Sequence, residues 1–199
     1  MMRYGLVIVG MVTTFAWGIT PADYKFIADA ENEWHYYAPY FDEYNPQIAQ
    51  QARKAVHNRG CNASDQHCKV QAILDLVSAI DYQLIPRNDP GTIRQNPDDM
   101  FKNGSGNCVD KTVMTIKMLK VLNIKSFAVM VPQHIFPIVY IKTPLSEQGG
   151  RYGDKTFTIQ GKTYYHLEPT AKGAYVGYSS FDPTKPYVIF DPETKERIR

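Results

Sequence analysis

The chain has 199 residues, of which 44% are hydrophobic and 21% are charged, and its formal net charge is +2. This length can bury one core of ordinary size, so we expect a single domain with short appendages. The charge is too balanced for a protein that binds nucleic acid through a strongly basic face, and we therefore expect no nucleic-acid partner.

The first 18 residues have the pattern of a signal peptide. Met1 to Arg3 form a short positive end, and Tyr4 to Trp17 form an uncharged, mostly apolar run. The run is shorter than the roughly 20 residues that cross a bilayer as a helix, and Ala16-Trp17-Gly18 offers small residues for a signal peptidase. We therefore predict export, with a signal peptide or an uncleaved membrane anchor over 1–18 and one catalytic domain over 19–199. A buried N-terminal strand is the structural alternative.

An aromatic segment and two helices follow this leader. Residues 31–44 are rich in Trp, Tyr and Phe. Asn45-Pro46 is typical of a helix start, and apolar residues at every fourth position predict an amphipathic helix over 46–58. A second helix is predicted from a cap at Ser64 to about Asp81, because its apolar residues recur at helical spacing.

The three cysteines divide into a close pair and a single thiol. Cys61 and Cys68 lie near each other in a polar stretch, whereas Cys108 stands alone further along the chain. In an exported protein this arrangement predicts a disulfide between the first two and one free thiol. His57 and His67 could join the pair in a tetrahedral zinc site, but the spacing matches no common zinc finger. We therefore expect the disulfide and no metal site.

A turn-rich segment leads to the most apolar helix of the chain. Turn-forming residues dominate Pro86 to Asn107, interrupted by one helical turn around Asp98 to Phe101. Cys108 to Leu122 then predicts a helix that is apolar over most of its circumference and therefore lies in the centre of the core. Asn123 can end it in the left-handed conformation.

Strand patterns occupy the rest of the chain. β-branched and aromatic residues predict strands over residues 126–131, 135–142, 157–160, 163–167 and 187–190. Gln160-Gly161-Lys162 is a tight turn between two of them. Helices followed by antiparallel strands indicate an α+β fold, with the Cys108 helix packed across the sheet.

Cys108 is the first candidate for chemistry because of its place at a helix start. The helix dipole and the free backbone amides of a first turn favour a thiolate there. The preceding Asn103-Gly104-Ser105-Gly106 lets the chain turn so that the sulfur points outward, and the same amides could hold an oxyanion. The alternative is a small buried hydrophobic residue, which is what most free cysteines are.

His134 and Glu168 are the candidate partners of this thiol. His134 opens a strand directly after Pro132-Gln133, which places it at the end of a sheet. Glu168 ends an apolar strand before Pro169, which is an unusual place for a carboxylate without a bonding partner. An ordinary surface charge is the alternative. We expect His166 to face away from Glu168. The other histidines lie in the aromatic segment or beside the cysteine pair.

These residues and their surroundings resemble the transglutaminase-like superfamily. Gly104 to Lys111, with Cys108 at its centre, is similar to the nucleophile segment of that family, His134 to Tyr140 to its histidine strand, and His166 to Thr170 to its acid segment. The resemblance covers about residues 69–177. It implies a papain-related α+β fold with Cys108, His134 and Glu168 as a catalytic triad.

The resemblance also assigns supporting roles and shows three departures. Tyr82 stands where the family often has an aromatic residue that could contribute to an oxyanion pocket with Asn107, and a core aromatic is the alternative for Tyr82. Asp110 should turn away from the thiol and cap the loop. Glu replaces the commoner Asp, residues 143–155 form an extra polar loop, and Ile135-Phe136-Pro137 replaces a small residue and Trp in the groove wall.

A thiolate paired with an imidazole can form a thioester from an amide, which water or an amine then resolves. The resemblance implies hydrolysis first, on a peptide, protein or cell-wall peptide substrate outside the cytoplasm, without a cofactor. Protein cross-linking by acyl transfer is the second alternative. A non-catalytic binding or scaffold domain of the same fold is the third. Contact with a membrane is expected only through an uncleaved N-terminal anchor.

Overall fold

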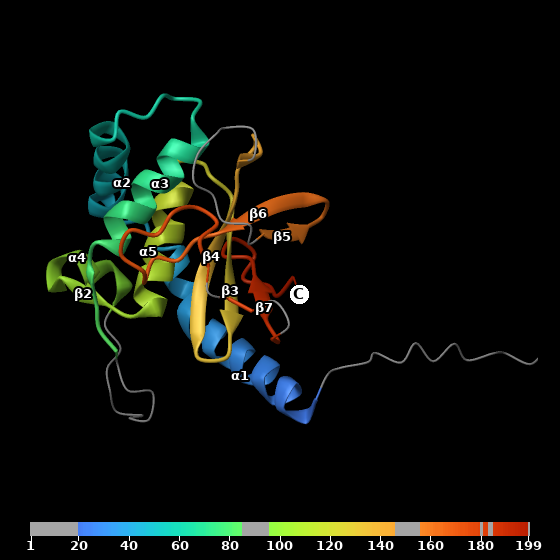
Figure 1. Cartoon of the computed structure of the whole chain (residues 1–199). Coiled ribbons are helices and arrows are strands. Elements are labelled where there is room, and N and C mark those ends of the chain that lie inside the picture. Colours follow the sequence, from blue (N-terminus) through green and yellow to red (C-terminus); the bar gives the residue numbers. More distant parts are fainter. Residues whose placement is uncertain (1–19, 85–95, 146–155, 180, 183–184, 199) are drawn as a thin grey trace, which may run out of the picture.

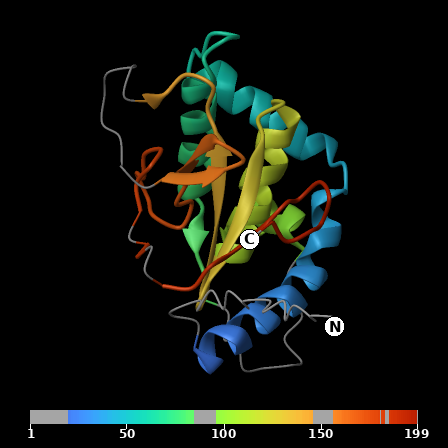
Figure 2. The same cartoon turned by 90° about the vertical axis from the view of Figure 1, so that its right-hand side faces the viewer.

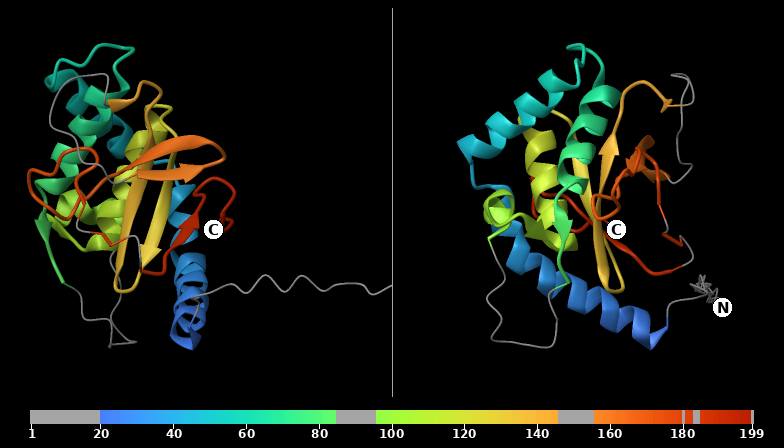
Figure 3. Two further views of the ribbon diagram at one scale, coloured as in Figure 1. Left: turned by 45° about the vertical axis from the view of Figure 1, so that its right-hand side comes forward. Right: turned by 60° about the vertical axis from the view of Figure 1, so that its left-hand side comes forward.

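The computed structural model describes residues 20–84, 96–145, 156–179, 181–182 and 185–198. The predicted leader therefore lies outside the described residues. Within them the chain has an α+β fold in which helices α2, α3 and α5 pack on one side of an antiparallel sheet (Figures 1 and 3). The helices are α1 Pro21–Tyr37, η1 Ala38–Phe41, α2 Pro46–Asn58, α3 Gln66–Ser78, η2 Pro97–Asp99, α4 Met100–Asn103 and α5 Cys108–Val121.

Helix α1 is the element that the sequence pattern did not predict. Thr20 caps it in a capping box with Asp23, and Pro21 occupies its first turn. Its Trp34 is 1% exposed, stacks on Phe190 with ring centroids 4.7 Å apart, and donates from Nε1 to the backbone oxygen of Lys195 at 2.8 Å. The aromatic segment thus serves the core. In both views of Figure 3, α1 lies at the lower end of the molecule.

Helices α2 and α3 follow the predicted positions, with one correction. Asn45 caps α2, whose bounds agree with the predicted 46–58. Helix α3 is shorter than predicted and is capped by Asp65, not Ser64, because the Asp65 carboxylate accepts from the Cys68 backbone amide at 2.8 Å. At the other end, Asp81 leaves the helix to pair with Ser105.

Helix α5 is the buried centre that its composition predicts. Every residue from Cys108 to Leu119 is buried. Asn107 and Asp110 form a capping box at its start, so Asp110 has the capping role expected of it. Asn123, with φ 56°, ends the helix in the left-handed conformation as predicted.

The main sheet has five antiparallel strands in the order β5-β6-β4-β3-β7. The strands are β3 Ser126–Val131, β4 His134–Tyr140, β5 Thr156–Ile159, β6 Lys162–His166 and β7 Val188–Phe190. All five predicted strands are present, with ends shifted by up to two residues. Gln160 and Gly161 both have positive φ, as a tight hairpin turn requires. Figure 2 shows the sheet obliquely, with α1 passing below it.

A short second sheet holds the segment that leads to the thiol. Strand β1, Asp81–Tyr82, pairs in parallel with β2, Ser105–Gly106. The sequence pattern did not predict this pairing, because two-residue strands carry no recognisable alternation. It fixes the approach to α5 against the end of α3.

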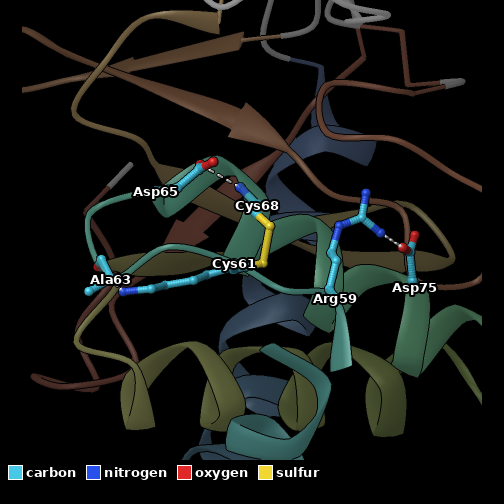
Figure 4. The surroundings of a disulfide bond; sticks show 7 residues. Arg59, Cys61, Ala63, Asp65, Cys68 and Asp75 are labelled. Atoms are coloured by element: carbon cyan, nitrogen blue, oxygen red, sulfur yellow. Dashed lines mark hydrogen bonds and ion pairs between the residues drawn. A yellow bond between two sulfur atoms is a disulfide. The ribbon is translucent and has the colours of Figure 1, made fainter. Parts of the chain in front are cut away.

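The Cys61–Cys68 disulfide is formed, as predicted, and it joins the end of α2 to the first turn of α3 (Figure 4). The ion pair of Arg59 with Asp75 joins the same two segments. The two cysteine sulfurs that the alternative zinc site would need are thus bonded to each other. A disulfide is typical of an oxidising compartment and agrees with export. Among the described helices, none is long and apolar enough to cross a bilayer.

Replacing both Cys61 and Cys68 by Ser should lower the free energy of unfolding by about 2.5 kcal/mol, because a loop of this size loses about that much chain entropy when it is closed. Urea denaturation of the oxidised protein and the double variant measures the difference. Reduction of the wild type should reproduce the loss. Equal stability of the two proteins, or three alkylatable thiols in the folded wild type without reductant, would contradict the pairing.

Candidate active site

Cys108 occupies the first position of α5 and is sheltered. It is 7% exposed and packs in a cluster with Val109, Val113 and Ile135. We expected the sulfur to point outward, and this expectation is wrong, because the Cys108 side chain is largely shielded from solvent. Burial alone would agree with the alternative of a small core residue. The neighbouring imidazole distinguishes the two interpretations.

Two glycines bring the chain to this thiol in different ways. Gly104 has φ 70°, which closes the short helix α4 in the left-handed conformation. Gly106 is needed for a close approach, because a Cβ there would lie 2.7 Å from Met100 Sδ and 3.1 Å from Asp110 Cβ. The segment that was expected to let the chain turn is therefore closely packed at its second glycine.

His134 lies between the thiol and a buried carboxylate. It opens β4 after Gln133, whose φ of 67° turns the hairpin. Its Nε2 lies 2.9 Å from Glu168 Oε2. Its side chain also interacts with that of Cys108, and this interaction contributes to its raised pKa. The structure thus brings together all three predicted site residues, from α5, β4 and the segment after β6.

The charges at this junction reinforce one another. Burial would lower the pKa of His134, but hydrogen bonds and charge interactions with Cys108 and Glu168 outweigh it and raise this pKa to about 9. Burial would raise the pKa of Glu168, but the hydrogen bonds from His134 and Thr170 and the nearby His166 ring outweigh it and hold this pKa well below its usual range. At neutral pH the imidazole is therefore a cation and the carboxyl group an anion.

Glu168 is held by its neighbours on both oxygens. Its Oε1 accepts from the Thr170 hydroxyl and from the Thr170 backbone amide, the latter at 3.2 Å. On the other side, His166 Nε2 lies 3.6 Å from Oε2. The expectation that His166 faces away from Glu168 is therefore wrong, because residues two apart in an extended chain point to the same side.

Lys111 ties this junction to the helices. It is 0% exposed, and its Nζ donates to the backbone oxygens of Val77, Ile80 and Pro169, at 3.2, 2.5 and 3.3 Å. It lies one turn after Cys108, and Pro169 directly follows Glu168. One ammonium therefore connects the nucleophile helix, the end of α3 and the turn that carries the acid. Sequence reasoning had no signal for this role beyond the presence of a Lys within a mostly apolar helix.

A cleft of about 610 Å³ opens beside His134 and Glu168, and Cys108 is not among the described residues that line it. His134, His166 and Glu168 line it, together with the aromatic side chains of Phe136 and Phe181. An acyl group bound there would lie against the imidazole. Phe136, one of the residues that depart from the family pattern, forms part of this wall.

The two residues with predicted supporting roles differ in what they can do. Tyr82 is 45% exposed and lines the cleft, so the core alternative is wrong and its oxyanion role stays a prediction. Asn107 uses its side-chain oxygen to accept from the amides of Val109 and Asp110, at 2.8 and 3.1 Å.

Among the described residues, no group of three or more His, Cys, Asp or Glu side chains could hold a metal ion.

No protein-family model and no curated protein matches this sequence. Among solved structures, the crystal structure of a putative protease from Parabacteroides distasonis is similar, with 12% identity and a TM-score of 0.49. The match covers 85% of this chain and 30% of that chain. The chemistry assigned to this chain therefore rests on its own side chains.

Gly106→Ala should destabilise the protein by about 1–3 kcal/mol, the usual cost of overpacking, and should displace Cys108 from His134. Gly104→Ala is the matched control, because open space surrounds that position and only its φ of 70° is strained. We expect the rate of alkylation of Cys108 by iodoacetamide at neutral pH to fall in the Gly106 variant alone. A wild-type rate in Gly106→Ala would contradict the role given to this close packing.

Proposed function

We propose that this chain is a thiol-dependent amide or isopeptide hydrolase of the transglutaminase-like type that acts outside the cytoplasm. The observation that carries the proposal is the His134 imidazole between a helix-terminal thiol and the buried Glu168 carboxylate, 2.9 Å from the latter. A solitary core cysteine needs neither partner. The same order of residues in the sequence resembles the Cys, His and acid segments of that superfamily.

In the proposed reaction the Cys108 thiolate attacks the carbonyl carbon of the substrate amide, and the negative charge moves to the oxygen. The backbone amides of Val109 and Asp110 already donate hydrogen bonds to the side-chain oxygen of Asn107. The backbone amide of Cys108 itself is therefore the first-turn donor proposed for this oxyanion, with Tyr82 as a second donor from across the cleft.

His134 then transfers protons in both directions. Its imidazolium gives a proton to the leaving amine as the C–N bond breaks, which leaves a thioester and a neutral imidazole. The imidazole next takes a proton from water, whose oxygen attacks the thioester and releases the acid and the thiolate. Glu168 keeps the ring oriented throughout and stabilises its charged form.

The proposed substrate is a peptide, a protein or a cell-wall peptide, and the cleft beside His134 is wide enough for a side chain next to the bond that is cut. The disulfide supports an extracytoplasmic location. Resolution of the thioester by an amine would give cross-linking instead. A binding or scaffold role would use the cleft without covalent chemistry.

Product analysis separates these functions. Hydrolysis predicts new peptide termini, or ammonia from a glutamine side chain without an amine joined to it; cross-linking predicts incorporation of a labelled amine. Cys108→Ala should abolish either product while it leaves the circular dichroism spectrum unchanged. Binding of a peptide without any product, in wild type and variant alike, would favour the scaffold alternative.

The reactivity of the Cys108 thiol can also be tested without any substrate. Iodoacetamide should modify Cys108 rapidly at mildly acidic pH, because the imidazolium of His134 stabilises the thiolate there. His134→Ala should slow this labelling about tenfold or more, since that charge is lost. Glu168→Gln should slow it less and should also lower turnover. If Cys108 resists alkylation until the protein unfolds, it is a core thiol and the proposed enzyme function is wrong.

The raised pKa of His134 predicts a loss of activity at high pH. The imidazolium persists below a pKa of about 9 and loses its proton above it, so the donor for the leaving amine disappears over that range. An NMR titration of the His134 ring should give a midpoint near 9 that coincides with the alkaline limb of kcat/KM. Glu168→Gln should move both to lower pH. An alkaline limb that is the same in this variant would assign it to another group.

A further inference from the structure

His166 is buried beneath the acid of the candidate triad. The residue is 1% exposed, and its ring stacks on Phe136 with centroids 3.9 Å apart. Both of its ring nitrogens are buried without a hydrogen-bond partner in the structure as described. Buried polar atoms are nearly always hydrogen bonded, so an imidazole in this setting calls for an explanation.

The polar atom that His166 faces is Oε2 of Glu168, the carboxylate oxygen that also contacts His134. Its Nε2 lies 3.6 Å from Glu168 Oε2, the same oxygen that lies 2.9 Å from His134 Nε2. A lone pair directed at a carboxylate would be repelled, so Nε2 carries the ring proton. Burial lowers the pKa of His166, which keeps the ring neutral. The group below Glu168 is thus a neutral donor and not a second cation.

Packing alone does not require an imidazole here. Tyr164 lies two residues earlier on the same strand and face, is 4% exposed, and packs against Phe127 and Tyr140. A carbocyclic ring fills that position without a ring nitrogen. Of these two buried rings on β6, the one with nitrogens is the one that reaches Glu168.

We propose that His166 is a positioning residue for Glu168, which holds Oε2 in place and keeps the carboxylate ionised while His134 gives up its proton. This inference rests on the proposed function and deepens it. After His134 protonates the leaving amine, Glu168 remains a buried anion beside a neutral ring. A second N–H at Oε2 then limits the cost of that charge and prevents the carboxylate from turning away.

The other charged groups around Glu168 come from three elements. Lys111 approaches from α5 and His134 from β4, while Asp182 and Lys185 line the same cleft. Burial would raise the pKa of Glu168, and the approach of the His166 ring to Oε2 is among the causes that outweigh burial and hold this pKa below its usual range. Removal of that ring nitrogen should raise the pKa of Glu168, while the other groups remain in place.

The test compares three variants of the full chain. His166→Phe keeps a ring on Phe136 and removes the donor, His166→Gln returns an N–H near the position of Nε2, and Tyr164→Phe is the control on the same strand. The readouts are a carboxyl ¹³C NMR titration of Glu168 through the acid range and the rate of Cys108 alkylation by iodoacetamide at neutral pH. Neither requires a known substrate.

We expect His166→Phe to raise the midpoint of the Glu168 titration by about one pH unit, a tenfold change in proton affinity. The alkylation rate at neutral pH should fall, because a less firmly held carboxylate orients the His134 imidazolium less well. His166→Gln and Tyr164→Phe should stay near the wild type. Once a substrate is found, kcat should fall in His166→Phe with little change in KM.

An unchanged Glu168 titration and an unchanged alkylation rate in folded His166→Phe would overturn the inference. If that variant does not fold, His166→Met, which also lacks a donor, replaces it. An equal shift in Tyr164→Phe would show a general packing effect and would also overturn the inference. Failure of the proposed function is distinguishable, because Cys108 of the wild type would then resist alkylation while the Glu168 titration still reports on His166.

Discussion

The burial of α5 along Cys108 to Leu119 is the constraint on which the rest of this structure depends. A helix with no solvent-exposed face has to satisfy its polar side chains inside the protein, and it does so by binding other elements. Lys111 binds the end of α3 and the turn after Glu168, and Lys117 pairs with Asp98 in η2. Each of these polar contacts places a neighbouring segment relative to the first turn of α5.

The packing around α5 also fixes the positions of the three residues of the candidate site. Cys108 comes from the start of the buried helix, His134 from the first residue of a central strand, and Glu168 from a turn that Lys111 holds through Pro169. None of the three lies on a free loop. The geometry between thiol, imidazole and carboxylate is therefore set by the packing of the core, as effective preorganisation of a site requires.

The sequence predicts most of this fold, and the errors have physical causes. The α2 helix, the α5 helix and all five strands of the main sheet were predictable, because their apolar residues recur at regular spacing. Helix α1 was missed since its buried face is dominated by aromatic residues, although Thr20-Pro21 with Asp23 marked its start. The three main site residues could be named from position and resemblance. Lys111 could not, because its role depends on the distant segments that meet it. His166 was misplaced for a local reason, since residues two apart in an extended chain point to the same side.

The bond from Trp34 to the backbone of Lys195 joins residues 161 positions apart in the chain. Helix α1 also belongs to the cluster that encloses Cys108. An N-terminal helix that docks on the last strand cannot find its place until the whole chain is available, whether the chain emerges from a ribosome or crosses a membrane. The thiol therefore acquires its final surroundings late in folding.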